Sequence, residues 1–209
     1  MEFPSESDLP DDYCTMKALI LSDIHGSALH VKQAVSFFEK WNADKIFILG
    51  DILYHGPRNI LPEKYGPMGV VDILSGYKDC IVAVRGNCDA DVDLMVLNFK
   101  IHENYFIYPD KNRNLFLSHG HIYDSDIFPL NFENPETKID AYLFGHTHIY
   151  TLETNRQNIL LCNPGSVSLP KGTGIKTFGF YDSDKETPTF SIHKLESGET
   201  LLEKTINKV

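Results

Sequence analysis

The stretch KALILSDIHG, residues 17–26, changes abruptly from apolar to polar. After Lys17 its first half is a continuous apolar run, which is typical of a buried strand. The run ends in a carboxylate and an imidazole, Asp23 and His25, with Gly26 beside them. Polar residues often end strands in turns, so the meaning of this ending depends on whether other strands repeat it.

Four more short apolar runs end in Asp, Asn or His with a glycine close by. In sequence order they are 46–49 before Gly50 and Asp51, 81–84 before Gly86 and Asn87, 115–117 before His119 and Gly120, and 142–144 before Gly145, His146 and His148. Five strands with such endings form a pattern that an isolated turn does not explain.

The segments between these runs indicate how the strands are arranged. Apolar residues recur at three- and four-residue steps from Ala28 to Trp41, which predicts an amphipathic helix, and 68–76 and 91–98 are weaker helical candidates. Alternating strands and helices predict a parallel sheet, and ligands bind beyond the carboxyl ends of the strands in such sheets. We therefore expect the five polar endings to meet at one edge.

The last third of the chain has a different pattern of apolar and polar residues. Residues 177–181, 189–195 and 201–206 alternate like hairpin strands and predict a second sheet. The apolar residues at positions 37–38 and 95–97 are expected to lie in the core.

The length of the chain bounds the number of domains. A chain of 209 residues suffices for one substantial domain, which we assign to residues 16–209. Residues 1–15 are rich in acids and contain no basic residue, so we expect them to form a disordered acidic extension. They also lack the apolar core of a secretory signal.

The composition excludes several classes of protein. No apolar run approaches the roughly 18 residues of a membrane helix. A net charge of −10 argues against stable nucleic-acid binding, whose usual sign is a basic patch. The four cysteines, at positions 14, 80, 88 and 162, include no CxxC pair, so we expect reduced thiols in a cytoplasmic protein.

The polar strand endings supply seven candidate metal ligands. They are Asp23, His25, Asp51, Asn87, His119, His146 and His148. Carboxylate, imidazole and amide donors without thiolate suit Mn²⁺, Fe²⁺, Zn²⁺ or Ni²⁺ better than a structural zinc site, which favours cysteine. Seven ligands exceed what one ion uses, and they fit two ions about 3.5–4 Å apart if one carboxylate bridges them.

The order of these residues resembles that of the calcineurin-like metallophosphoesterases. The stretches that carry the resemblance are SDIHGS (22–27), GDILYHGPRN (50–59), VRGNCDADVD (84–93), LFLSHGH (115–121), GHTH (145–148) and NPGSVSLPKG (163–172). GHTH alone would be weak evidence, but the five ligand motifs Asp-x-His, Gly-Asp, Gly-Asn, a later His and Gly-His-x-His, all in register, are highly specific. The similarity runs from about residue 16 nearly to the C-terminus.

The resemblance implies a fold and a set of ligand roles. The fold would be a four-layer α/β/β/α sandwich of two mixed sheets flanked by helices. One metal would take Asp23, His25 and His148, the other would take Asn87, His119 and His146, and Asp51 would bridge them. Mn²⁺ is the preferred ion by family and ligand type. The implied activity is hydrolysis of a small phosphodiester by a hydroxide held between the two ions, in a protein that forms a homo-oligomer.

Cys88 departs from the family pattern, in which many members carry a histidine that helps to protonate the leaving oxygen. A thiol with a pKa of about 8.5 is a poor general acid near neutrality. We therefore expect weak activity on alkyl monoesters and a preference for diesters with good leaving groups. Asp89 keeps the acid position beside it as a candidate catalytic residue. A small buried filler without a catalytic part is the open alternative for Cys88.

Three further residues are candidates for roles around the metals. Arg58 could hold phosphate oxygens bidentately, and His55 lies on the same loop; both are assigned to substrate binding, with a surface role as the alternative. Asn87 is assigned to substrate binding as well as to a metal. His121 follows a ligand by two residues and is assigned to catalysis, either as a proton donor or as a support for that ligand. NPGSVSLPKG is expected to support the pocket.

Two other functions remain open on this scaffold. One is a phosphomonoesterase or protein phosphatase, against which Cys88 and the short chain speak. The other is a non-catalytic interaction module of the kind represented by the retromer subunit of this fold, against which the complete ligand set speaks. A Rossmann-type nucleotide site is set aside, because no GxGxxG follows the first strand.

Overall fold

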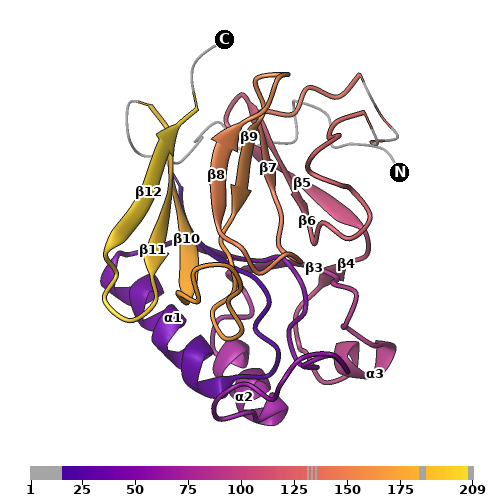
Figure 1. Cartoon of the computed structure of the whole chain (residues 1–209), viewed down its shortest axis with the longest axis vertical. Helices are drawn as coiled ribbons and strands as arrows, with labels where there is room; N and C mark the ends of the chain where they lie inside the picture. The colour runs from indigo at the N-terminus through magenta and orange to yellow at the C-terminus, as the bar shows by residue number, and fades with distance from the viewer. Residues whose placement is uncertain (1–15, 131, 133, 135, 184–186, 207–209) are drawn as a thin grey trace.

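Two mixed sheets pack face to face in the structure, which is a computed structural model that describes residues 16–130, 132, 134, 136–183 and 187–206 (Figure 1). The expected acidic extension, residues 1–15, lies outside the described residues. In the order in which they pair, the strands of the first sheet are β12 (Thr200–Thr205), β11 (Thr189–Lys194), β10 (Thr177–Asp182), β1 (Lys17–Leu21), β2 (Lys45–Ile48), β3 (Ile81–Val84) and β4 (Ile101–His102).

The second sheet is built from the middle of the chain. Its strands pair in the order β5 (Tyr105–Asp110), β6 (Arg113–Ser118), β7 (Ala141–Leu143), β9 (Leu160–Asn163) and β8 (Thr151–Thr154). Strands β6, β7 and β9 run parallel, while β5 and β8 are antiparallel edges. The predicted sandwich of two mixed sheets is confirmed.

The prediction that the C-terminal strands form a second sheet is wrong. β10 pairs antiparallel with β1, so β10, β11 and β12 extend the first sheet instead. The expectation that the five polar strand endings share the edge of one sheet is also wrong. Those after β1, β2 and β3 belong to the first sheet and those after β6 and β7 to the second, so the site lies where the two sheets meet.

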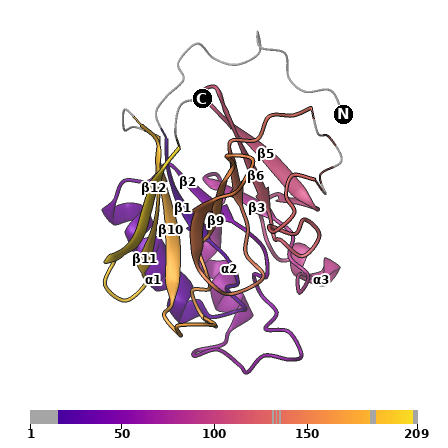
Figure 2. The same cartoon turned by 45° about the horizontal axis from the view of Figure 1, so that its top comes forward.

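Two helices cover the outer face of the first sheet (Figure 2). They are α1 (Ala28–Lys40) and α2 (Pro67–Ser75), and both match the predicted segments closely. Their buried side chains, such as Val31 and Val70, pack on Leu19 and Ile46 of the strands. The third candidate helix is a single turn, α3 (Asp91–Leu94). No helix in the described residues is long and apolar enough to span a membrane.

The short α3 corrects one expectation about the core. Leu97 is buried, but Met95 is 84% exposed and Val96 is 39% exposed. Because the helix ends at Leu94, the chain that follows turns these two side chains outward.

One apolar cluster fills the space between the two sheets, and one further cluster covers the outer face of each sheet. Leu115, Leu117 and Leu143 of the second sheet meet Ile20 and Phe47 of the first between the sheets. The outer face of the second sheet is covered by residues of the turn-rich stretches 121–130 and 136–139 and by Phe132, rather than by a helix in the described residues. An aromatic cluster around Phe116 fills that layer.

Replacing Phe116 with Ala should strongly destabilise the fold. Its ring lies within 4.9–5.3 Å of five aromatic rings, centroid to centroid. Removing a buried Phe from such a cluster costs about 3–5 kcal/mol of unfolding free energy, which urea denaturation measures. Met95→Ala is the control and should change it by less than about 0.5 kcal/mol. Equal losses in the two variants would contradict this account of the outer layer.

Candidate metal centre

The seven predicted ligands come together at the carboxyl ends of β1, β2, β3, β6 and β7. Asp23, His25, Asp51, His119 and His148 are buried, His146 is half-buried and Asn87 is exposed. Backbone hydrogen bonds hold the first loops together: His25 N donates to Asp51 O at 2.9 Å, and Asp23 N donates to Gly50 O at 3.2 Å. Ligands distant in the sequence thus occupy adjacent turns.

Most of these ligands have an unusual backbone conformation. Five of the seven have positive φ angles between 48° and 66°, namely Asp23, His25, Asp51, His146 and His148. Non-glycine residues rarely adopt this left-handed region, and strained backbone of this kind clusters at functional sites. The strand ends are therefore bent to aim side chains rather than simply to reverse the chain.

Three of the histidines are oriented by backbone carbonyl groups. The Nδ1 atoms of His25, His119 and His148 lie 2.6–2.7 Å from the carbonyl oxygens of Tyr54, Leu49 and Leu169 respectively. A carbonyl only accepts, so each Nδ1 carries the hydrogen and donates it. This leaves each Nε2 directed into the site, as in histidines that ligate metals.

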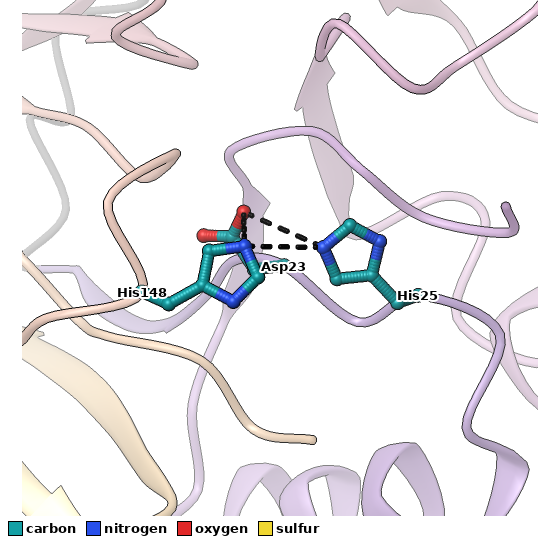
Figure 3. A group of neighbouring side chains, drawn as sticks. All are labelled: Asp23, His25 and His148. Carbon is teal, nitrogen blue, oxygen red and sulfur yellow. Dashed lines mark hydrogen bonds and ion pairs between the residues drawn. The ribbon is translucent and has the colours of Figure 1, made fainter. Parts of the chain in front are cut away.

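The first group of ligands consists of Asp23, His25 and His148 (Figure 3). The Nε2 atoms of the two histidines face each other at 3.3 Å, and His148 Nε2 lies 3.3 Å from Asp23 Oδ1. That oxygen is buried and accepts no hydrogen bond from a described residue. Two inward imidazole nitrogens beside an unpartnered carboxylate oxygen are the arrangement that a cation completes.

The second group surrounds Asp51, whose Oδ2 lies 3.4 Å from His119 Nε2 and 3.7 Å from His25 Nε2. Asn87 Oδ1 lies 3.1 Å from His119 Nε2. The His146 ring is 5.2 Å from that of His119, centroid to centroid. Asp51 therefore contacts a histidine of each group, which fits the predicted bridging role.

The pKa values reflect how closely these groups are packed. Burial raises the pKa of Asp23 to about 6. Burial alone would lower the pKa of His119, but its hydrogen bond to Asp51 and the charges of Asp23 and Asp51 raise it to about 9. Burial and the charge of His119 lower the pKa of His146 to about 4. The opposite directions of the shifts at His119 and His146 show that the buried carboxylates and imidazoles of the site interact strongly.

The donor set therefore fits two divalent ions. Asp23, His25 and His148 would hold one ion, and Asn87, His119 and His146 the other, with Asp51 shared. The carboxylates and imidazoles match Mn²⁺, Fe²⁺, Zn²⁺ and Ni²⁺ in their ligand preferences.

Asp89 lies beside the centre but has its own partners. Its Oδ2 accepts hydrogen bonds from the backbone N–H groups of Asp51 and Gly86, both at 2.8 Å, and its Oδ1 accepts from Ile52 N at 2.7 Å. Both oxygens are thus occupied in joining the end of β2 to the end of β3. This geometry favours a positioning role for Asp89 over the catalytic role predicted from the sequence.

Cys88 lies between the carboxylate of Asp51 and the loop at Gly56. Its backbone N–H donates to Asp51 Oδ1 at 2.8 Å, and its Sγ accepts from Asn87 Nδ2 at 3.3 Å. Burial and the charge of Asp51 raise the pKa of the thiol to about 12. A thiol in this environment stays protonated and is a poor acid, as the sequence predicts.

The remaining predicted residues lie around the centre at different depths. The His121 ring is 5.3 Å from that of His119, centroid to centroid, and its side chain lines a small hollow behind Asn87. Arg58 is exposed and lines the cleft above Asp51. His55 packs against Tyr54 and Tyr65 instead, and its buried Nδ1 has no partner among the described residues.

The NPGSVSLPKG loop supports the first ligand group more directly than its sequence indicates. Ser166 Oγ and Ser168 Oγ donate to the Asp23 carbonyl at 2.7 and 3.2 Å. Asn163 Nδ2 donates to the Gly145 carbonyl at 2.9 Å. These residues, and Ser22, whose hydroxyl donates to Asp23 Oδ2 at 2.8 Å, were not singled out from the sequence. The contacts of Asn163, Ser166 and Ser168 join residues far apart in the sequence, and no local pattern marks them.

Comparisons with known proteins agree with this geometry. A family model described as a calcineurin-like phosphoesterase superfamily domain matches residues 16–186. Phosphodiesterase YfcE of Escherichia coli strain K12 is 40% identical over 169 residues, which are 81% of this chain and 89% of that protein.

Solved structures resemble the chain over most of its length. A structure of YfcE, described as a phosphoesterase from E. coli, has a TM-score of 0.82 at 38% identity and covers 92% of this chain and 100% of its own. Vacuolar protein sorting 29 from Cryptosporidium parvum has a TM-score of 0.63 at 16% identity, covers 93% and 99%, and shares the fold alone. From its sequence, fold and assembled ligands, this chain belongs to the calcineurin-like phosphoesterase superfamily.

Proposed function

We propose that this chain is a metal-dependent phosphodiesterase. The observation that carries the proposal is the pair of ligand groups that meet at Asp51, with a buried, unpartnered Asp23 oxygen beside two inward imidazole nitrogens. The identity to phosphodiesterase YfcE supports the same reaction class. The substrate is a small phosphodiester.

The residues around the centre would have the following roles in binding the ions and the substrate. Two divalent ions, when bound, supply a nucleophile from water and neutralise charge on the phosphoryl oxygens. Asp51 would hold the two ions at a fixed separation. Its orientation is fixed by Cys88 N–H and by the carboxylate of Asp89, which anchors its backbone. Asn87 would add a neutral oxygen ligand, and its exposed side chain also lines the cleft.

Mn²⁺ is the ion we propose, with Zn²⁺, Fe²⁺ and Ni²⁺ as alternatives. All the proposed ligand atoms are oxygen or imidazole nitrogen, and such sites take any of these ions according to availability. A cytoplasmic location and a homo-oligomeric state stay predictions from the sequence.

Asp51→Asn should abolish turnover of bis-p-nitrophenyl phosphate and leave the fold intact. The asparagine keeps the oxygen that accepts from Cys88 N–H but loses the charge shared by the two ions. We expect a loss of more than roughly a hundredfold, the upper end for residues that merely support a ligand. Circular dichroism checks the fold, and elemental analysis should show fewer bound metal ions per chain.

Exposed Asp79 gives a matched control for this variant. Asp79→Asn makes the same charge change away from the site and should keep both metal content and activity. Unchanged turnover in Asp51→Asn would count against the bridging role. Metal-stripped protein should be inactive and recover best with Mn²⁺; a non-catalytic interaction module would stay inactive with every ion.

Cys88→His should raise the activity on p-nitrophenyl phosphate relative to bis-p-nitrophenyl phosphate. A histidine at this position could protonate the leaving oxygen, and general acid catalysis contributes roughly 10²–10⁴-fold. The wild-type chain should prefer the diester, and Cys88→Ser should retain that preference. A wild-type chain that clearly prefers the monoester would favour the phosphomonoesterase alternative.

A further inference from the structure

A cleft of about 840 Å³ opens over the metal ligands, and it is larger than one phosphate group needs. Three segments line it: the loop 54–59 after β2, the loop 85–90 after β3, and the region of His146, His148 and Lys171. The first two carry motifs already assigned to the centre. Lys171, at the end of the NPGSVSLPKG loop, has no part in the function described so far.

Three basic side chains reach this cleft, and one of them is already neutralised. Arg85 Nη2 lies 2.7 Å from Asp91, its Nη1 lies 3.3 Å from Glu103, and its Nε donates to the Asp89 carbonyl. Arg58 and Lys171 line the same cleft, and neither forms an ion pair with a carboxylate of the described residues. Two uncompensated positive charges therefore remain in a chain whose net charge is −10.

The backbone of Lys171 is fixed to a metal ligand. Its N–H donates to the carbonyl of His148 at 3.0 Å, while His148 Nδ1 donates to the Leu169 carbonyl at 2.6 Å. Lys171 lines the cleft together with His146 and His148, so its charge lies on the same side of the cleft as these two histidines. The side chain of Lys171 thus extends from a rigid attachment into the cleft.

Arg58 is presented by a loop that is also held in place. Asn59 Nδ2 donates to the His55 carbonyl at 2.8 Å, and Gly56 has a φ of 78° that permits the sharp turn. A Cβ at Gly56 would lie 3.1 Å from Cys88 Sγ, so this loop packs tightly on the loop after β3.

The charges in the cleft exceed what a simple diester needs. Two divalent ions held by the carboxylates of Asp23 and Asp51, with a hydroxide between them, would leave roughly one positive charge at the centre. A phosphodiester carries a single negative charge, which the centre itself satisfies. Arg58 and Lys171 would then remain unpaired in the complex unless the substrate carried further negative charge.

We infer that the cleft binds a phosphodiester whose alcohol group carries a second phosphate, and that Lys171 and Arg58 hold this second phosphate. The inference rests on the proposed phosphodiesterase function and names its substrate class. Arg58 offers a planar pair of donors and Lys171 a point charge, which together suit a phosphate group. The metal centre selects the bond to be cleaved, and the two cations select the group attached to it.

Binding of two matched nucleotides to the Mn²⁺-loaded protein tests this without turnover. Thymidine 3′,5′-bisphosphate and thymidine 5′-monophosphate differ only in a second phosphate, and calorimetry at equal free Mn²⁺ gives both Kd values. We expect the bisphosphate to bind roughly five- to tenfold more tightly, as one charge-assisted contact in a partly exposed cleft provides. Lys171→Gln and Arg58→Gln should each reduce this ratio, and the double variant should bring it close to one.

Lys138→Gln is the matched control, because Lys138 is exposed, pairs with Asp140 at the opposite end of β7 and makes the same charge change. It should keep the wild-type ratio. Equal Kd values for the two nucleotides in the wild-type protein would overturn the inference. The inference would also be overturned if the variants weakened the binding of both nucleotides equally, because that result indicates a general attraction of anions. Hydrolysis of bis-p-nitrophenyl phosphate, measured separately, decides the phosphodiesterase function whatever the ratio is.

Discussion

The site depends on one constraint, which is that two imidazole nitrogens are held facing each other at its centre. His25 Nε2 and His148 Nε2 face each other at 3.3 Å beside an Asp23 oxygen that accepts no hydrogen bond from the described residues. Buried polar atoms are nearly always paired, so this arrangement is costly unless a cation lies among them. The ligands are thus placed for an ion, and the surrounding structure holds them there against their mutual repulsion.

That support comes from backbone groups more than from side chains. Carbonyl oxygens fix three imidazole rings, and backbone N–H groups fix the carboxylate of Asp89, which in turn holds the turn at Asp51. Glycines allow the strand ends to approach closely: a Cβ at Gly86 would lie 2.2 Å from Asp51 Oδ1. The positive φ angles of the ligands are maintained because many such contacts act on the same few turns.

The residues that come together at the centre can be recognised in the sequence because each of them follows an apolar run, and that pattern is local. The partners of the strands are not local. β10 pairs with β1 across most of the chain, and an alternating strand fits the edge of either sheet equally well, so the C-terminal strands were assigned to the wrong sheet. Ser166 was missed for the same reason, since its hydroxyl contacts a carbonyl 143 residues away. Met95 was misplaced because α3 ends one turn earlier than its apolar residues indicate.

The buried and exposed parts of the site have different roles. A change at Asp23 or His148 would leave a buried polar group unpaired, so the chemistry is tied to the fold. Arg58 and Lys171 lie at the rim of the cleft, where a substitution costs little stability. The rim can therefore differ between proteins that share the same centre, which is why membership of the superfamily indicates phosphoester chemistry but not the alcohols that flank the phosphorus. The identity of those alcohols has to be inferred from the charges and the shape of the cleft.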